Sequence, residues 1–356
     1  MDFEEQLEML REPLALRLGQ VVTGARTIHA VHRQSSAVRC CELLLADGTY
    51  HRVWVKCLHA SLQKVAARDL RTARDYDVTA HLFGAFPAGS VWAVPEPLLF
   101  LPEHRLIVTK HVEGARLQNK LTQRFVGLRR MSAAHELGRD FQKVGQWLKM
   151  FQRSTVSYCP GDGLGLPPLE AKSPAFIVSQ AERRLDACEA LIKSDTTWIG
   201  HARRYLRGEL SQASCGDNEA AWCGIHGDFF AGNVLVSDNG VAGIDFSSAT
   251  WGTPLFDPAY CLFQLDTLTS KPFVRRESID GLALQFLRGF GWDGGVRDFW
   301  TSDPTARILY VALRISRVLS LIHTEGNSPL RHLWRQLLAK RTVREMERWI
   351  DGPSAG

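Results

Sequence analysis

Three polar residues in one short stretch of the chain have the types and the spacing that phosphoryl transfer requires. Asp228, Asn233 and Asp245 follow one another in this order. Phosphoryl transfer needs a carboxylate beside the acceptor hydroxyl and hard oxygen ligands for the Mg²⁺ that accompanies nucleotide phosphates. Asp228 is therefore the candidate catalytic residue, which would position the hydroxyl and accept its proton. Asn233 and Asp245 are the candidate Mg²⁺ ligands.

The segment between Asn233 and Asp245 predicts a turn that brings those two residues together. Residues 234–236 and 241–244 predict two short strands, and the Ser-Asp-Asn-Gly sequence at 237–240 predicts a tight turn between them. Such a hairpin would place Asp245 beside Asn233. An ordinary hairpin or a turn-capping aspartate would explain one of these pieces, but not the order and spacing of all of them.

Two motifs in this stretch resemble those of kinases. His226-Gly227-Asp228 stands where protein kinases carry His-Arg-Asp, and Asp245-Phe246-Ser247 stands where they carry Asp-Phe-Gly. The glycine in the first motif and the isoleucine before the second aspartate resemble the aminoglycoside phosphotransferase family and related small-molecule kinases. The resemblance extends over residues 25–268 and is specific at the two motifs and at residues 53–56.

This resemblance implies an α+β, two-lobed, protein-kinase-like fold. Residues 1–110 would form a small, antiparallel, β-rich N-terminal lobe that binds ATP. Residues 111–356 would form a larger, mainly helical C-terminal lobe that carries the catalytic and acceptor-binding residues. The resemblance also implies that the protein is a kinase that requires ATP and Mg²⁺.

The pattern of apolar residues predicts elements that agree with such a fold. A helix is expected at 3–17, where Pro13 would interrupt it, and strands are expected at 26–33, 37–46 and 50–58. Apolar residues at spacings of three and four predict further helices at 65–83, 133–151, 174–193, 198–212, 255–268, 278–290, 304–323 and 329–350.

The third predicted strand supplies a candidate phosphate ligand. Its sequence Val53-Trp54-Val55-Lys56 resembles the Val-Ala-Ile-Lys strand of kinases, which implies that Lys56 contacts the ATP phosphates. The family orients this lysine with a helix glutamate, and Asp75 occupies the corresponding position here. Because Asp is one methylene shorter than Glu, a pair with Lys56 requires that the helix lies closer to the strand or that the pair forms only on closure. The alternative is that Asp75 is a solvated residue on the helix surface.

Two further segments are candidates for binding the nucleotide. The loop between the first two strands has no glycine, so we expect Ser35 and Ser36 to face the phosphates instead. An apolar strand at 105–112 runs into Glu-Gly and resembles the hinge of the family. That resemblance implies that the backbones of Lys110 and Val112 pair with the adenine edge, whereas an ordinary edge strand is the alternative.

Composition excludes several other classes of protein. The chain has 356 residues, 45% of them hydrophobic and 23% charged, which is typical of a globular protein with room for two cores. No apolar run reaches the roughly 18 residues of a membrane span, and the acidic start does not resemble a signal peptide. The eight cysteines are scattered and predict reduced thiols, so we expect a cytoplasmic protein. The sequence contains no Lys/Arg run, so we expect no nucleic-acid partner.

The charge of the C-terminal region bears on the acceptor. Residues 270–356 contain 14 Lys/Arg and 9 Asp/Glu. A polycationic aminoglycoside would need an acidic site, so this balance favours a neutral or anionic acceptor. Six arginines could bind phosphate or carboxylate groups, or could simply be solvated: Arg275, Arg276, Arg314, Arg317, Arg331 and Arg335. Four aromatic residues could pack against a sugar ring or acyl chain: Trp251, Phe256, Tyr260 and Phe263.

The sequence therefore predicts an ATP-dependent phosphotransferase that acts on a hydroxyl of a small molecule or glycan, such as a cell-envelope sugar or glycolipid precursor. Two alternatives stay open. One is an antibiotic-inactivating phosphotransferase, which shares the chemistry but differs in its acceptor. The other is a non-catalytic kinase-like module that binds a nucleotide or a partner.

Overall fold

The computed structural model describes residues 3–32, 36–58, 65–87, 89–126, 132–164, 170–192, 196–213, 222–271, 274–323 and 328–352. Its contacts divide the chain into two compact units. Unit 1 comprises Met1–Thr122, Arg153–Pro168 and His226–Thr250. Unit 2 comprises Gln123–Gln152, Leu169–Ile225 and Trp251–Gly356. The functional division into lobes at residue 110 stays a prediction.

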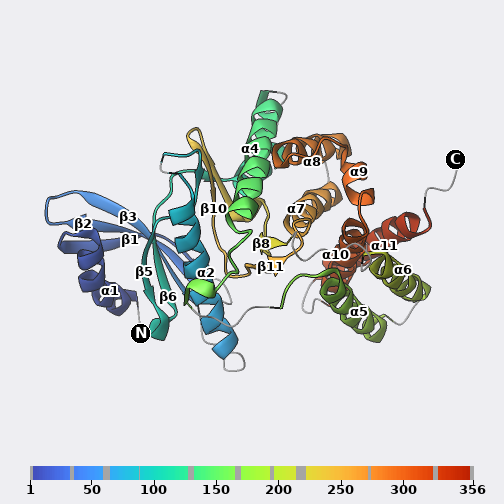
Figure 1. Cartoon of the computed structure of the whole chain (residues 1–356), viewed down its shortest axis with the longest axis horizontal. Coiled ribbons are helices and arrows are strands. Elements are labelled where there is room, and N and C mark those ends of the chain that lie inside the picture. Colours follow the sequence, from blue (N-terminus) through green and yellow to red (C-terminus); the bar gives the residue numbers. More distant parts are fainter. Residues whose placement is uncertain are drawn as a thin grey trace. The chain divides into compact units, whose positions relative to one another are not determined.

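Five strands of unit 1 form an antiparallel sheet in the order β1-β2-β3-β6-β5 (Figure 1). They are β1 (Val22–His32), β2 (Ser36–Leu45), β3 (Tyr50–Leu58), β5 (Pro97–Leu101) and β6 (Leu106–Lys110). The three strands predicted in the first sixty residues are confirmed. Strand β3 is hydrogen-bonded on both edges, to β2 and to β6, so its backbone is held on both sides.

Helix α1 (Phe3–Leu18) packs on this sheet and completes its hydrophobic core. Leu10 and Leu14 are buried with strand residues that include Leu43, Val53 and Val108. The expected interruption at Pro13 was wrong, since the helix continues through that residue. A proline inside a helix costs about 3 kcal/mol, whereas burial of two leucine side chains contributes roughly 3–6 kcal/mol. Packing on the sheet therefore outweighs the loss at Pro13.

A second, smaller sheet in unit 1 contains the predicted hairpin. Its order is β4-β10-β9-β7, with β4 (Trp92–Ala93), β7 (Ala115–Arg116), β9 (Val234–Ser237) and β10 (Gly240–Gly243). Ser237 pairs with Gly240, so the turn consists of Asp238 and Asn239, as the sequence predicted. The hairpin joins the segment before β9 to the segment after β10.

Unit 1 also contains one long helix and three single helical turns among its described residues. Helix α2 (Val65–Ala85) confirms the helix predicted at 65–83. The single turns are η1 (Pro102–His104), η2 (Asp162–Leu164) and η4 (Ala231–Asn233). Helix α2 contacts β5, β6 and η2, so it links the large sheet to the segment around residue 163.

Unit 2 is mainly helical. Its helices are α5 (Pro174–Leu191), α6 (Thr197–Ala213), α7 (Phe256–Thr267), α8 (Arg276–Phe290), α9 (Val296–Thr301), α10 (Pro304–Ile322) and α11 (Pro329–Ile350), with the short turn η5 (Leu268–Ser270). The unit boundary falls within α3 (Leu117–Val126) and α4 (Ser132–Ser154). Strands β8 (Cys223–Ile225) and β11 (Thr250–Gly252) pair with each other.

Helix α10 is central to unit 2, since it contacts α5, α6, α7, α9 and α11. Its start follows from the sequence, because Pro304 occupies the first turn and the Asp303 side chain accepts a hydrogen bond from the Thr305 amide. Over the described ranges, no helix is both long enough and apolar enough to cross a membrane.

Candidate active site

Lys56 lies at the centre of the candidate site. Its Nζ atom is 2.6 Å from Oδ2 of Asp75 and 2.7 Å from Oδ1 of Asp245. Strand β3 carries the lysine, α2 carries Asp75, and Asp245 follows β10. Asp75 is buried, so the alternative of a solvated helix residue is wrong. The lysine therefore bridges two carboxylates that are 170 positions apart in the sequence.

Asp75 also fixes the backbone after Asp245. Its second carboxylate oxygen accepts a hydrogen bond of 2.7 Å from the amide of Phe246. Asp245 has a φ of 69°, in the left-handed region, which costs a residue with a side chain about 1–2 kcal/mol. This conformation turns the Asp245 carboxylate toward Lys56 and the next amide toward Asp75. The shorter Asp side chain reaches both groups because α2 lies close to them.

The ionisation of these residues is set by their mutual contacts. Burial by itself would lower the pKa of Lys56, but Asp75 and Asp245 outweigh burial and raise that pKa. Burial would raise the pKa of Asp245, but Lys56 and a 2.8 Å hydrogen bond from the Ser247 hydroxyl hold it well below its usual range. Asp245 is therefore a carboxylate and Lys56 an ammonium at neutral pH, as binding of a cation and of phosphate requires.

The loop around Asp228 is held by Asn233. The Asn233 side-chain amide donates to the backbone oxygen of Asp228 at 3.0 Å and to its Oδ2 atom at 3.2 Å. Gly227 has a φ of +78°, and a Cβ atom at this position would lie 2.2 Å from the carbonyl oxygen of Ser248. A side chain at position 227 would therefore disrupt the loop, which gives a steric reason for the glycine in this motif.

His226 is a structural residue of the site that the sequence analysis did not assign. It is fully buried, and its Nε2 atom lies 3.1 Å from the carbonyl oxygen of Ile244. Its ring packs against Phe229 and Phe246, at centroid distances of 5.6 and 5.0 Å. His226 thereby connects the Asp228 loop to the strand that precedes Asp245. Ser247, which bonds to Asp245, was also missed, and its place in the second motif was the signal available for it.

The donor atoms at this site fit a magnesium ion. Asn233 uses its nitrogen for Asp228, so its Oδ1 atom is left as an acceptor. Asp245 receives Lys56 and Ser247 on Oδ1, and no donor among the described residues bonds to its Oδ2. One carboxylate oxygen and one amide oxygen thus remain for a cation. This is a usual protein contribution to a Mg²⁺ site, where phosphates and water supply the other ligands.

The predicted phosphate-facing serines are only partly described. Ser35 lies outside the described residues. Ser36 is the first residue of β2 and is buried. It lies two positions from Val38, which pairs with Lys56, so Ser36 and Val38 share one face of the sheet.

The predicted hinge residues, Lys110 and Val112, differ in whether their backbone groups already form hydrogen bonds. The Lys110 amide donates to the carbonyl oxygen of Glu96 at 2.9 Å, so it is already engaged. In the described part of the chain, no backbone hydrogen bond engages Val112. His111 stacks on Trp54 and accepts a 2.9 Å hydrogen bond from the indole, which fixes the chain next to Val112. Val112 is thus better placed than Lys110 to offer both a donor and an acceptor.

Comparisons with known proteins agree with this arrangement. The sequence model of the phosphotransferase enzyme family matches residues 64–300, two thirds of the chain. The match includes Asp75 and both motifs, and Lys56 lies before it. No curated protein sequence matches the chain.

Solved structures share the fold over nearly the whole chain. An ADP-bound aminoglycoside phosphotransferase has a TM-score of 0.57 at 14% identity, over 97% of this chain and 99% of its own. An amicoumacin kinase in complex with AMP-PNP and Ca²⁺ has a TM-score of 0.57 at 14% identity, over 98% and 96%. A choline/ethanolamine kinase family protein from Mesorhizobium loti has a TM-score of 0.53 at 12% identity, over 97% and 98%. The expected α+β, kinase-like fold is confirmed. The chain therefore belongs to the phosphotransferase enzyme family, and it is a kinase whose acceptor group is a hydroxyl.

Proposed function

We propose that this kinase transfers the γ-phosphoryl group of ATP, in the presence of Mg²⁺, to a hydroxyl of a neutral or anionic small molecule or glycan. The contact of Lys56 with both Asp75 and Asp245 is the observation that supports this proposal most directly. It assembles, from three distant segments, the cation and the carboxylates that nucleotide phosphates and their metal ion need.

Each residue of the site has a proposed role. Lys56 binds the phosphates, Asp75 orients Lys56, and Ser35 and Ser36 face the phosphates. Asn233 and Asp245 hold Mg²⁺, which when bound neutralises charge on the phosphates. The backbones of Val112 and Lys110 receive the adenine, and Val112 has the open donor and acceptor.

Asp228 is the proposed catalytic residue. It accepts the proton of the acceptor hydroxyl, so that the oxygen can attack phosphorus as the bond to the leaving nucleotide breaks. Asn233 holds the Asp228 carboxylate through its side-chain nitrogen. This contact fixes the direction of the proton acceptor before the substrate arrives, which lowers the entropic part of the barrier.

The charge of the C-terminal region supports an acceptor that is not a polycation. Ion pairs reduce the surplus of positive charge in residues 270–356, however. Arg276 and Arg314 bind Asp266, and Arg307 binds Glu209. Both carboxylates lie outside residues 270–356. Among the four aromatic residues suggested for the acceptor, Phe263 is buried. Phe256 and Tyr260 stack on each other at 6.5 Å and are only half-buried, so they are the better candidates to pack against a sugar ring.

An antibiotic acceptor is the second candidate. The fold is similar to that of an aminoglycoside phosphotransferase and of an amicoumacin kinase over nearly the whole chain. A radiolabelled-ATP assay with Mg²⁺ would separate the two. Its acceptor panel would contain neutral sugars, phosphorylated sugars, glycolipid precursors, amino alcohols and aminoglycosides.

Transfer to a neutral or anionic acceptor, abolished by Asp228→Asn, is the expected result. Efficient transfer to aminoglycosides alone would overturn the proposed acceptor class. Absence of any Mg²⁺-dependent nucleotide binding in a calorimetric titration would favour the alternative of a non-catalytic kinase-like module.

A further inference from the structure

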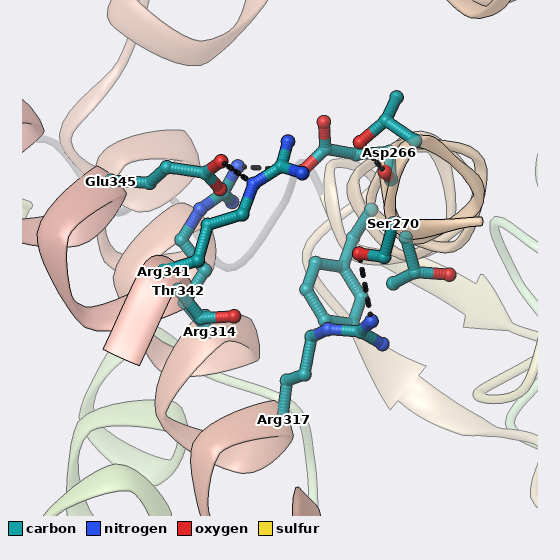
Figure 2. A pocket seen from close by; sticks show the side chains of 10 residues that line it. Asp266, Ser270, Arg314, Arg317, Arg341, Thr342 and Glu345 are labelled. Carbon is teal, nitrogen blue, oxygen red and sulfur yellow. Dashed lines mark hydrogen bonds and ion pairs between the residues drawn. The ribbon is translucent and has the colours of Figure 1, made fainter. Parts of the chain in front are cut away.

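A small pocket in unit 2 is lined by several charged side chains (Figure 2). The pocket is a shallow depression with little enclosed space, and part of it is open to solvent. Helices α7, α10 and α11 and the turn η5 contribute the lining residues, which include Asp266, Ser270, Arg314, Arg317, Arg341 and Glu345. None of these six residues is among those proposed above to bind the nucleotide, the metal ion or the reacting hydroxyl.

Arg314 gives the pocket a fixed, buried positive charge. Only 5% of this residue is exposed, and its guanidinium lies 3.4 Å from the ring centroid of Tyr310, which stacks in turn on Trp349. One terminal nitrogen donates to Asp266 at 3.0 Å. Its Nε atom is buried, and no hydrogen-bond acceptor among the described residues reaches it. Arg314 therefore cannot swing away to solvent, and part of its donor capacity is unused.

One guanidinium group of the pocket has no carboxylate partner among the described residues. Arg341 binds Glu345 at 2.8 Å, and Asp266 is shared between Arg314 and Arg276. Arg317 is half-buried, and in the described part of the chain no carboxylate lies within ion-pair distance of it. The lining thus has three arginines against two carboxylates.

The only hydrogen bond of Arg317 among described residues goes to the hydroxyl of Ser270, at 3.2 Å. The neighbouring hydroxyls of Thr267, Thr269 and Thr342 all donate to helix carbonyl oxygens. Ser270 instead acts as an acceptor for Arg317, so its own proton is available to a ligand. Arg317 and Ser270 together offer several N–H donors and one O–H donor on the same side of the pocket.

We propose that this pocket is a binding site for a phosphate group, held by Arg317 and Ser270 with Arg314 as the buried cation behind them. The planar guanidinium binds phosphate oxygens in a bidentate way, and tetrahedral phosphate can accept the serine proton at the same time. A bound phosphate also neutralises the surplus charge of the lining. The ligand is either free phosphate or a phosphate monoester, which share this chemistry.

Calorimetric titrations with inorganic phosphate at constant ionic strength test the site. The proteins are the full-length chain and its variants Arg317→Gln, Ser270→Ala, Arg331→Gln and Lys56→Ala. Arg331→Gln is the matched control, because it makes the same change at an exposed arginine of α11. Lys56→Ala removes the residue that is proposed to bind phosphate in the nucleotide site. This variant therefore distinguishes phosphate binding at the nucleotide site from phosphate binding in unit 2.

We expect phosphate to bind at least ten-fold more weakly to Arg317→Gln, and more weakly to Ser270→Ala, while Arg331→Gln and Lys56→Ala bind like the unaltered chain. Titration with glycerol phosphate distinguishes the two proposed ligands, since tighter binding of this monoester than of inorganic phosphate would identify a phosphate monoester as the ligand. Titration with acetate tests whether the site prefers phosphate to a carboxylate. Equal affinity of Arg317→Gln and the unaltered chain, loss of binding in Lys56→Ala alone, or tighter binding of acetate than of phosphate would each overturn the proposal. None of these results depends on kinase activity.

Discussion

Position 75 carries Asp where the resemblance to kinases implies Glu, and the structure gives a physical reason. Both oxygens of Asp75 are already at short distances from their partners, 2.6 Å to the Lys56 nitrogen and 2.7 Å to the Phe246 amide. The residue is also buried, so a longer side chain has no adjacent solvent to enter. The helix that carries Asp75 is therefore matched to the shorter residue.

A change of Asp75 to Glu is expected to weaken nucleotide binding, although it restores the residue that the family pattern contains. The extra methylene must displace Lys56 or the Phe246 amide, and overpacking of this kind costs typically 1–3 kcal/mol. The Michaelis constant for ATP should rise about ten-fold. Asp75→Asn is the matched comparison, because it keeps the size and removes the charge. A Glu variant that binds ATP at least as tightly as the unaltered enzyme would contradict this account of position 75.

Asp228 is expected to act on turnover and not on binding. Loss of a general base typically lowers the rate 10²- to 10⁴-fold, and Asp228→Asn keeps the size of the side chain. The Mg²⁺-dependent affinity for ATP should therefore stay within about two-fold, because the residues proposed to hold the nucleotide are unchanged. Single-turnover transfer and nucleotide titration measure the two effects separately. Near-normal turnover of the variant on a confirmed acceptor would show that Asp228 is not the base.

At the scale of elements, helix α2 is fixed on two sides. Asp75 joins it to Lys56 and the Phe246 amide, and Asp77 joins it to the segment at 158–164. The Asp77 carboxylate accepts hydrogen bonds from the Tyr158 hydroxyl and from the Gly161 amide. The hydrogen bonds of Asp77 thus hold helix α2, which also carries Asp75, the partner of Lys56.

The same segment makes further contacts with α2. The buried Arg74 donates to the carbonyl oxygen of Pro160 at 2.6 Å. His81 stacks on Tyr158 with ring centroids 3.6 Å apart. Burial and the neighbouring Asp77 raise the pKa of Tyr158, so its hydroxyl stays protonated and remains a donor. These contacts make Asp77 and Tyr158 positioning residues for Asp75.

Tyr158→Phe is expected to loosen the position of α2. Removal of the hydroxyl leaves the buried Asp77 with one hydrogen bond fewer, at a cost of about 1–3 kcal/mol of folding stability. The Michaelis constant for ATP should rise several-fold, with a smaller change in kcat, because Asp75 orients Lys56 less well. Tyr76→Phe is the control, since Tyr76 lies on the same helix and its ring stacks on Phe100. Equal kinetics of the two variants would leave Tyr158 with a purely structural role.

The sequence predicted long periodic elements better than short ones. The bounds of α10 and α11 agree with prediction within a residue because their apolar periodicity is strong and Pro304 and Pro329 mark their starts. Helices α3 and α9 were missed, since 10 and 6 residues contain too few apolar repeats to be recognised. Strands β4 and β7 have two residues each, and they depend on pairing with the hairpin, which no local pattern encodes.

The candidate site was predictable where motif spacing is local. The sequence indicated that Asn233 and Asp245 belong to one hairpin, and η4, β9 and β10 confirm that hairpin. The partner of Lys56 stayed open because the distance between β3 and α2 depends on packing of the whole unit. The role of Asp77 was not foreseen for the same reason, as its partners lie more than 80 residues away.

At the scale of the whole molecule, the described residues proposed to bind nucleotide and metal all belong to unit 1, although they span positions 36 to 245. The segment His226–Thr250 is separated from the N-terminal strands by over a hundred residues of chain, and most of the helices of unit 2 follow it. The proposed phosphate pocket lies entirely in unit 2. The two ligands should therefore stabilise different parts of the chain.

Hydrogen exchange with Mg²⁺ and ATP tests this separation. A ligand at 100 times its Kd stabilises its site by about 2.7 kcal/mol, which slows exchange through openings that destroy the site about 100-fold. We expect this protection in β3, in α2 and in residues 226–246, and little change in α10 and α11. Omission of Mg²⁺, or the variant Asp245→Asn, should remove most of it, because Asp245 supplies the proposed carboxylate ligand. Protection that is confined to unit 2, or that is equal without Mg²⁺, would place the nucleotide elsewhere and refute the metal site.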